Sequence, residues 1–216
     1  MTANSLADLY QTPLVLDAEH VRLEPLTMAH VPELFDVAQD EEIWRWLATP
    51  PPATLEEMRA LVTDALEAQS GGRELPFAVV ERGSGRAIGA TRYMRIEPAH
   101  GHLEIGWTWY GSAYWRTAVN TECKYVLLRH AFESLGCIRV QLMTDLRNER
   151  SQRAIERIGA TREGVLRNYR IVPKDGYHRS NVCYSIIDDE WPSVKTRLEA
   201  MLSKGRGHPS GQAQSG

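Results

Sequence analysis

The chain has few cysteines, no long apolar run and no strong excess of one charge. Its 216 residues include only three cysteines, Cys123, Cys137 and Cys183, and no two of them form a close CxxC pair. An odd number of cysteines, each within an apolar pattern, indicates a reduced protein without a disulfide scaffold. The same pattern argues against a zinc site and against a catalytic cysteine, so we predict no metal site.

Membrane insertion and nucleic-acid binding are also disfavoured. No segment approaches the roughly 20 consecutive apolar residues that a membrane helix needs, and residues 1–11 lack the basic region and apolar core of a signal peptide. The formal net charge is -3, so no global basic field points to nucleic acid. We expect a soluble, cytoplasmic protein. A homodimer would fit the base rate for soluble enzymes, although no sequence feature indicates one.

What the chain does contain is an ordinary globular composition. Hydrophobic residues make up 43% and charged residues 25%, which suits one domain with a core that needs no disulfide. Residues 1–13 carry little periodicity, and residues 205–216 are rich in Gly, Ser and Gln. We therefore predict a flexible N-terminal arm (1–13), a single domain (14–204) and a disordered C-terminal tail (205–216).

Hydrophobic periodicity predicts strands and helices in a mixed order. A hairpin is indicated where Phe77–Val80 and Ala87–Ala90 flank Gly83-Ser84-Gly85. The other predicted strands are Val21–Leu26, Leu103–Trp109, Ile138–Thr144, Val165–Val172 and Val182–Ile187, and the predicted helices are His30–Gln39, Thr54–Gln69, Glu122–Leu135, Arg150–Ile158 and Trp191–Leu202. A meander followed by strand–helix–strand–helix predicts an α+β fold, with a mixed sheet and helices on both faces.

Two stretches carry a family resemblance. Cys137–Leu142 is followed by Asn148-Glu149-Arg150-Ser151 and Arg157-Ile158-Gly159-Ala160, and upstream Leu103-Glu104-Ile105-Gly106-Trp107 precedes a long amphipathic helix. This order resembles the two central motifs of the GNAT acyltransferase superfamily, and most closely its Rim-type protein N-acetyltransferase branch, over about residues 21–191. The resemblance implies a GNAT-like, largely antiparallel sheet of about seven strands, splayed at Leu103–Trp109. It also implies transfer of an acetyl group from coenzyme A to an amine.

The segment before the helix predicted near Glu122 is the candidate site for acetyl-CoA. The N–H groups and the dipole at a helix start attract phosphate. We expect Asn120 or Thr121 to cap the helix and Arg116 to meet a phosphate oxygen. The family pattern Gln/Arg-x-x-Gly-x-Gly/Ala falls on Trp115-x-x-Ala118-x-Asn120, which departs from it at all three positions, so an ordinary loop entering a helix is the alternative. The candidate residues are Trp115, Arg116, Thr117, Ala118, Val119, Asn120 and Thr121.

Further cofactor contacts follow from the resemblance. Asn148 lies between a strand and a helix, where it fits an N-cap or an Asx turn, and the family also places an asparagine here against the pantetheine arm. Trp107, Thr108 and Trp109 fall where family members pair strand backbone with the pantetheine amides. A backbone N–H of this strand is the expected donor to the oxyanion.

Glu104 is the candidate general base. A carboxylate near the split in the sheet would have a raised pKa, suited to taking a proton through water, whereas an outward residue of an alternating strand would be solvated. The tyrosine that many superfamily members carry in the short helix is Ile155 here. Ser151 is therefore the candidate acid, as in Rim-type enzymes, and an ordinary serine of the first helical turn is the alternative. We expect His130 to be structural.

The amine acceptor is expected to contact two variable regions, Trp44–Pro52 and Arg167–His178. Trp44, Trp46, Tyr169 and Tyr177 would form an aromatic slot, or they would pack over the sheet. The leading hypothesis is an acetyl-CoA-dependent N-acetyltransferase that acts on a protein N-terminus or a small amine by direct attack on the thioester. A non-catalytic acyl-CoA sensor is an alternative. An antibiotic or polyamine acetyltransferase is another, and it would need acidic side chains in the acceptor pocket.

Overall fold

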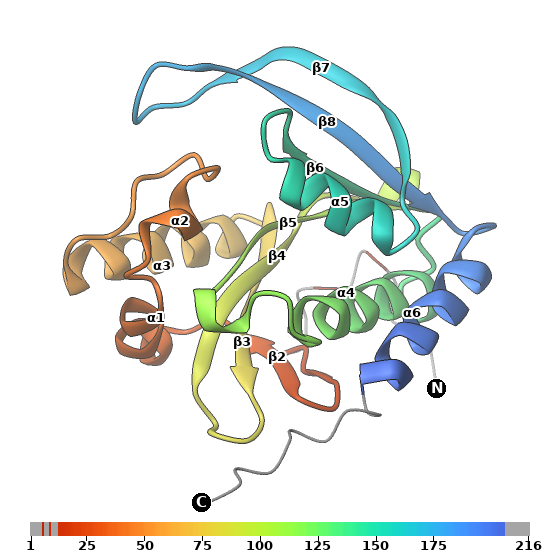
Figure 1. Ribbon diagram of the computed structural model, residues 1–216, viewed down its shortest axis with the longest axis horizontal. Coiled ribbons are helices and arrows are strands. Elements are labelled where there is room, and N and C mark those ends of the chain that lie inside the picture. Colours follow the sequence, from red (N-terminus) through yellow and green to blue (C-terminus); the bar gives the residue numbers. More distant parts are fainter. Residues whose placement is uncertain (1–5, 7–8, 10–12, 206–216) are drawn as a thin grey trace, which may run out of the picture.

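The computed structural model describes residues 6, 9 and 13–205, which form a sheet with helices on both faces (Figure 1). Eight strands are joined in the order β1-β2-β3-β4-β5-β6-β8-β7. The strands are β1 (Leu16–Asp17), β2 (Val21–Pro25), β3 (Glu74–Glu81), β4 (Ala87–Glu97), β5 (His102–Tyr110), β6 (Arg139–Asp145), β7 (Thr161–Ile171) and β8 (His178–Ile187). The helices are α1 (Val31–Val37), α2 (Glu41–Trp44), α3 (Leu55–Ser70), α4 (Val119–Arg129), which continues into a π-helical turn η5 (His130–Ser134), α5 (Glu149–Arg157) and α6 (Trp191–Gly205).

The α+β prediction is confirmed, with eight strands where the sequence predicts about seven. The additional strand is β1, which pairs with β2 through only Leu16 and Asp17. Two residues are too few for an alternating pattern, so periodicity cannot reveal this strand.

The sheet opens between β5 and β6. These two strands are parallel and pair at three positions, the last of which joins Glu104 to Gln141. Beyond this pair β5 continues to Tyr110 and β6 continues to Asp145, and β6 keeps its antiparallel pairing with β8 on its other side. A parallel pair needs a crossover connection, which α4 supplies. The splay predicted at Leu103–Trp109 is therefore present and begins after Glu104.

β5 also carries a bulge beside this opening. Ala90 of β4 is opposite Trp109, and Arg92 is opposite Gly106, so β5 has one more residue than β4 across this stretch. Trp107 has a φ of 49°, which turns the strand locally. After the bulge, Trp109 packs with the helices on one face and Tyr110 with the core on the other face.

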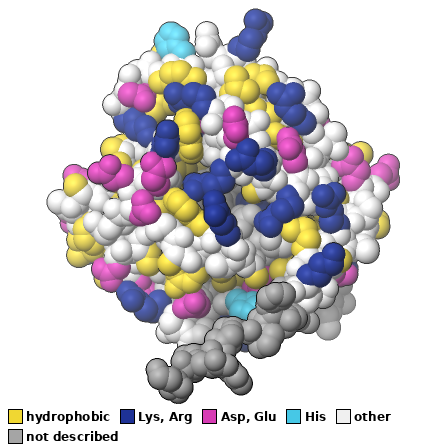
Figure 2. All heavy atoms as spheres, viewed as in Figure 1, with side chains coloured by type: hydrophobic (Ala, Val, Ile, Leu, Met, Phe, Trp, Pro, Cys, Tyr) yellow, Lys and Arg dark blue, Asp and Glu magenta, His cyan; other side chains and the backbone are white. Residues whose placement is uncertain are grey.

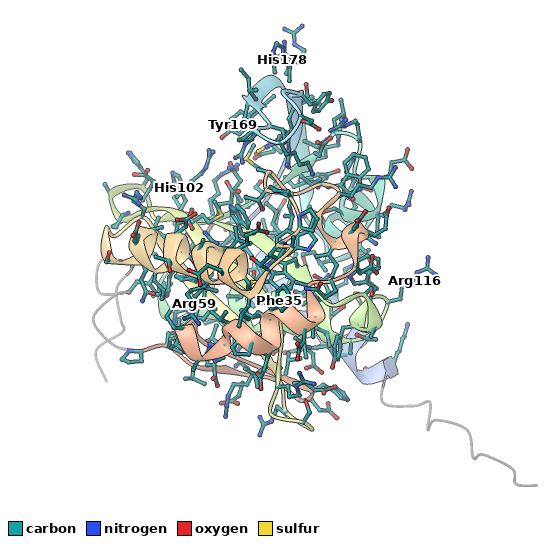
Figure 3. All side chains as sticks on the ribbon, turned by 90° about the vertical axis from the view of Figure 1, so that its left-hand side faces the viewer. Phe35, Arg59, His102, Arg116, Tyr169 and His178 are labelled. Atoms are coloured by element: carbon teal, nitrogen blue, oxygen red, sulfur yellow. The ribbon has the colours of Figure 1, made fainter. Side chains whose placement is uncertain are left out.

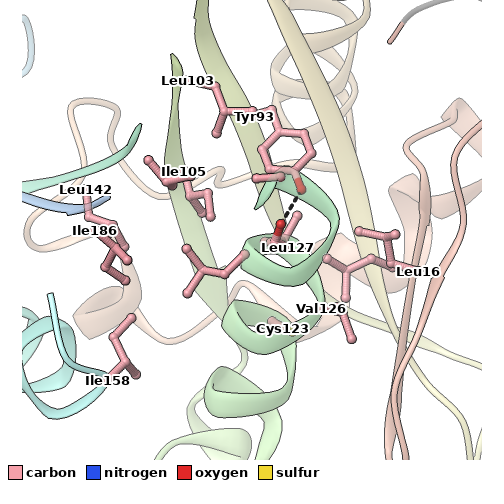
Figure 4. Close-up of a cluster of buried hydrophobic side chains, with 14 of the residues drawn as sticks. Leu16, Tyr93, Leu103, Ile105, Cys123, Val126, Leu127, Leu142, Ile158 and Ile186 are labelled. Carbon is pink, nitrogen blue, oxygen red and sulfur yellow. Dashed lines mark hydrogen bonds between the residues drawn. The ribbon is translucent and has the colours of Figure 1, made fainter. Parts of the chain in front are cut away.

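Two hydrophobic clusters fix the sheet between its helices. The larger one joins the sheet to α4 and α6, and Figure 4 shows part of it, including the hydrogen bond from the hydroxyl of Tyr93 to the carbonyl oxygen of Leu127. The smaller one joins α1, α2 and α3 to the other face through residues such as Val31, Met58 and Trp109. These two layers hold the edges of the opening between β5 and β6 at fixed positions.

The helix predicted from Glu122 begins earlier, at Val119. Ala118 is its N-cap and offers no side-chain acceptor, while the hydroxyl of Thr117 accepts from the N–H of Val119 at 3.3 Å. Asn120 and Thr121 therefore lie inside the first turn, and the prediction that one of them caps the helix is wrong. The sequence misleads because alanine is a weak capping residue.

The predicted N-terminal arm and C-terminal tail fall mostly outside the described residues. Within the arm, Leu6 and Leu9 are described, and both are buried in the larger hydrophobic cluster, which differs from a loose arm at those two positions. α6 reaches Gly205, and the rest of the predicted tail is outside the described range. In the described part of the chain, no helix has the length and apolar character required to cross a bilayer.

Candidate active site

The opening between β5 and β6 leads into a cavity of about 910 Å³. Its walls come from β5, the start of α4, β6 and α5, and from two segments far apart in sequence, residues 43–48 and the β7–β8 hairpin. Figure 2 shows a hollow in this face of the molecule with Lys and Arg side chains gathered around it. A cavity of this size is in the range of small-molecule and cofactor sites.

The charged side chains that line the cavity are mostly basic. Among the residues that the structure describes, Glu104 is the single acidic one in the lining. The basic lining residues are Arg116, Lys124, Arg150, Arg153, Arg157, Arg170 and Arg179. This excess of positive charge is local, since the whole chain has a net charge of -3, and it favours an anionic ligand.

The start of α4 forms one end of the cavity. In the described structure the N–H groups of Asn120 and Thr121 have no hydrogen-bond partner, as expected in a first helical turn. Arg157 donates to the hydroxyl of Thr121 at 3.3 Å, and Arg150 lies 3.9 Å over the Trp115 ring. Arg116 is exposed and points away from the body of the molecule (Figure 3). Asn120 lines the cavity, and its free N–H group and the nearby guanidinium groups suit a phosphate.

The remaining residues of the predicted cofactor segment divide into two groups. Trp115, Arg116, Thr117 and Asn120 line the cavity. Ala118, Val119 and Thr121 do not, and Val119 and Thr121 are buried. The sequence thus places the right segment at the cavity, although only part of it faces inward.

Asn148 and Ser151 lie at the start of α5, and both line the cavity. The side-chain oxygen of Asn148 accepts from the N–H of Ser151 at 3.1 Å, so the predicted N-cap is present. Ile155, at the position where many family members carry tyrosine, also lines the cavity one turn farther along α5. Trp107, Thr108 and Trp109 line the opposite wall on β5.

Glu104 lies at the point where the two strands separate. Its side chain faces the cavity and is also in contact with a second cavity of about 280 Å³ on its other side. One carboxylate oxygen accepts from Gln141 at 3.1 Å and forms an ion pair with Nε of Arg95 at 3.2 Å. Burial raises the pKa of Glu104, against the opposing effects of the Gln141 hydrogen bond and the Arg95 charge. A buried carboxylate with a raised pKa is better suited to accept a proton than a solvated one.

Lys124 is a cavity residue that the sequence reasoning missed. It lies on α4 one turn after Asn120, is only 6% exposed, and donates from Nζ to the hydroxyl of Thr108 at 2.9 Å. The Thr108 hydroxyl is in turn 2.8 Å from that of Thr91, which is fully buried. Burial lowers the pKa of Lys124 to about 8. The sequence feature that could have indicated its burial is the presence of a lysine within the apolar face of the helix.

The four predicted acceptor residues do not come together. Trp46 lines the cavity. Trp44 is 1% exposed, packs against Trp109 with ring centroids 5.3 Å apart, and donates to the carbonyl of Ala38, so it belongs to the core. Tyr169 accepts from Arg95, and Tyr177 packs under Arg147; neither lines the cavity. The aromatic slot of four residues is therefore not formed.

Two arginines, Arg170 and Arg179, line the end of the cavity near Trp46, where the acceptor was predicted to bind, and form a cationic frame there. Arg179 donates to the carbonyl of Trp46 at 2.9 Å and to Asn181 at 2.6 Å, tying β8 to the segment after α2. Arg170 is opposite Arg179 across the β7–β8 pair, and its charge acts on Glu104. In the described part of the chain, the guanidinium of Arg170 makes no hydrogen bond or ion pair; it lies over the Tyr169 ring at 5.6 Å and lines the cavity.

One group among the described residues has metal-ligand geometry, and it is elsewhere. Glu19, His20 and Glu122 bring one ligand atom each to within 4.8 Å of one another. None of the three lines the cavity, and Glu122 already accepts hydrogen bonds from the backbone N–H groups of His20 and Val21.

The chain is similar to known proteins in both sequence and fold. A family model described as an acetyltransferase (GNAT) domain matches residues 20–161. A GCN5-related N-acetyltransferase from Brucella melitensis has a similar structure, with 32% identity, a TM-score of 0.85 and coverage of 92% of this chain and 90% of that chain.

Two further proteins are similar to this chain in part of the sequence or in fold. YdaF of Bacillus subtilis (strain 168), named a putative ribosomal N-acetyltransferase, is 30% identical over 111 residues, which are 51% of this chain and 59% of YdaF. Mycobacterium smegmatis RimJ, solved in complex with CoA-disulfide, has the same fold, with a TM-score of 0.71 at 22% identity over 88% of this chain and 93% of RimJ.

Proposed function

Because the chain belongs to the GNAT acetyltransferase family, we propose that it transfers an acetyl group from acetyl-CoA to a primary amine by direct attack, with Glu104 as the general base. The observation that carries this proposal is the position of Glu104. It is a buried carboxylate at the point where β5 and β6 part, and it faces a cavity with basic walls.

The residues around the cavity fit an acyl-CoA molecule as substrate. The free N–H groups of the first turn of α4, with Arg150 and Arg157 beside them, would hold the phosphates. The backbone of β5 at Trp107–Trp109, which is unpaired on the side facing β6, would meet the pantetheine amides, with Asn148 on the facing helix. The departures from the family pattern at Trp115, Ala118 and Asn120 leave this backbone arrangement intact, because the donors are main-chain groups.

Glu104 would take the proton that the acceptor ammonium must lose before attack. Glu104 contacts both cavities. The proton would arrive from the acceptor in the larger cavity and could leave through the smaller cavity, which has His102 and Glu97 in its walls. Arg95 keeps the carboxylate in place through its ion pair. The oxyanion donor remains a backbone N–H of the Trp107–Trp109 stretch, where the bulge turns the strand.

The charge of the cavity favours some acceptors over others. Polycationic substrates need compensating acidic groups, yet in the described part of the chain Glu104 is the single acid in the lining. Asp36 pairs with Arg86, Asp40 caps α2, and neither lines the cavity; Glu41 and Glu42 do not line it either. Arg170 acts on the base, and Arg179 lies opposite Arg170 in the same cavity. We therefore propose an acceptor that is neutral or carries a carboxylate besides its amine, such as a protein N-terminus, rather than a polyamine.

The test is acetyl-CoA-dependent thiol release with matched acceptors. The panel contains a peptide with an acidic second residue, the same peptide with lysine there, and spermidine. We expect acceptor-dependent release in the order acidic peptide, lysine peptide, spermidine. Glu104→Gln should lower kcat by roughly 10²-fold or more, while Glu67→Gln on the exposed face of α3 serves as the control. Binding of CoA with no turnover of any amine would support the sensor alternative instead.

A further inference from the structure

Lys124 combines deep burial with an almost complete lack of partners. Its Nζ reaches the Thr108 hydroxyl at 2.9 Å, and no carboxylate of the described chain forms an ion pair with it. Glu122, two residues earlier on the helix, is occupied by His20 and the backbone of β2. A buried charge without a counter-ion lowers stability, which suggests a role other than holding the fold together.

The position of Lys124 connects it with the reaction. Asn120 and Lys124 are four residues apart on α4, so they share the face that lines the cavity. Thr108 of β5 and Ile155 of α5 line the same cavity. Lys124 is thus next to the strand on which the oxyanion donor is proposed, and it shares the cavity with the α5 position that lacks the tyrosine hydroxyl.

The leaving group of the proposed reaction is a thiolate, and an ammonium group is suited to it. The other basic residues in the cavity lining are arginines, which keep their protons in proteins and so supply charge without a proton. Burial lowers the pKa of Lys124 to about 8, close to the value of about 8.5 for an ordinary thiol. Proton transfer between groups of similar pKa is efficient near neutral pH.

We infer that Lys124 donates the proton to the departing sulfur of the acyl donor, a role that the sequence alone suggested for Ser151. The inference rests on the proposed function. As the acceptor nitrogen forms its bond to the carbonyl carbon, the C–S bond breaks and its electron pair stays on sulfur. Lys124 gives one proton from Nζ to that sulfur and becomes a neutral amine, held by the Thr108 hydroxyl. Glu104 takes one proton from the acceptor ammonium before attack, the nitrogen releases its second proton to water as the amide forms, and Lys124 regains a proton from water.

The experiment measures acceptor-dependent thiol release from pH 6 to pH 10 for the wild type, Lys124→Met, Lys124→Arg and Ser151→Ala, with Lys204→Met at the exposed end of α6 as the control. We expect Lys124→Met to lower kcat by roughly 10²-fold and to remove a decline in rate above about pH 8. CoA affinity, measured by calorimetry, should change little. Lys124→Arg should not restore kcat, because arginine retains its proton.

A second acyl donor separates proton donation from a structural role. Phenyl thioacetate releases a more acidic thiol that departs without a proton, so the loss in Lys124→Met should shrink to a few-fold with this donor. An equal loss with both donors would overturn the inference, as would a larger loss in Ser151→Ala or full rescue by Lys124→Arg. Acetylation of Lys124 itself, detected by mass spectrometry, would assign it a nucleophilic role instead. Failure of the wild type with every acceptor would remove the proposed function and the inference together, whereas an unaffected Lys124→Met removes the inference alone.

Discussion

Glu122 and Lys124 lie two residues apart on α4, carry opposite charges, and are 3% and 6% exposed. Their surroundings differ completely. Glu122 faces the start of β2, where its carboxylate accepts from the N–H groups of His20 and Val21 at 2.9 and 3.2 Å and contacts the His20 ring at 2.5 Å. Lys124 faces the cavity and has one hydroxyl partner. Buried charge with several partners indicates a structural role, and buried charge with few partners indicates a functional one.

The largest expected effect on stability comes from removing Glu122, the buried charge with several hydrogen-bond partners. Glu122→Ala leaves the N–H groups of His20 and Val21, at the start of β2, without their acceptor, and the Val21 group is buried. We expect this change to lower the free energy of unfolding by about 3–5 kcal/mol. Urea denaturation measures this directly, with Glu67→Ala on the exposed face of α3 as the control. A loss no larger than that of the control would mean that Glu122 does not anchor β2.

Much of the fold follows from local patterns that the sequence displays. The β3–β4 hairpin and the cap at Asn148 are present where expected. Both depend on turn residues or alternation over a few positions, which tertiary contacts reinforce rather than override. The opening of the sheet beside β5 was implied by the family resemblance and not by such local patterns.

The site itself was less accessible to prediction. A lysine on a helix normally extends its charge to water, so burial of Lys124 follows only from the packing of α4 against the bulged strand β5. Trp44 looked like a ligand residue, yet its contact with Trp109 comes from a strand more than sixty positions away along the chain. The cationic frame of Arg170 and Arg179 depends in the same way on strand register and on contact with a distant loop.

Lys124, the buried charge without a counter-ion, should lower the stability of the folded protein, whereas Glu122 should raise it. The pKa of Lys124 is about 8 in the folded protein, below its ordinary value of 10.5. Between these values the unfolded chain binds a proton that the folded chain does not, so stability should rise with pH from about 8 to 10.5. The full difference corresponds to roughly 3 kcal/mol at most.

Lys124→Met isolates this contribution. The variant should be at least as stable as the wild type near neutral pH, where the buried charge is fully present. The stability difference between the two proteins should shrink as the pH rises above about 8, because the wild-type lysine loses its charge there. Thermal unfolding at a series of pH values measures the difference, and a lower stability of Lys124→Met at neutral pH would show that the ammonium supports the fold.

His130, at the end of the same helical run, sharpens the comparison with a group that is buried in its neutral form. It stacks on Tyr93 with ring centroids 6.1 Å apart, and burial lowers its pKa to about 4 from 6.5. Between pH 6.5 and pH 4 the unfolded chain binds the proton and the folded chain does not. The free energy of unfolding should therefore decrease as the pH is lowered through this window. The loss should reach about 2 kcal/mol by pH 5, and His130→Gln should remove that part of the pH dependence.

Because His130 does not line the cavity, kcat at neutral pH should be unchanged in His130→Gln. Lys124→Met should have the reverse pattern, with retained stability and lost turnover. If His130→Gln and Lys124→Met lowered kcat to the same extent, the different surroundings of the two side chains would not separate a catalytic group from a structural one.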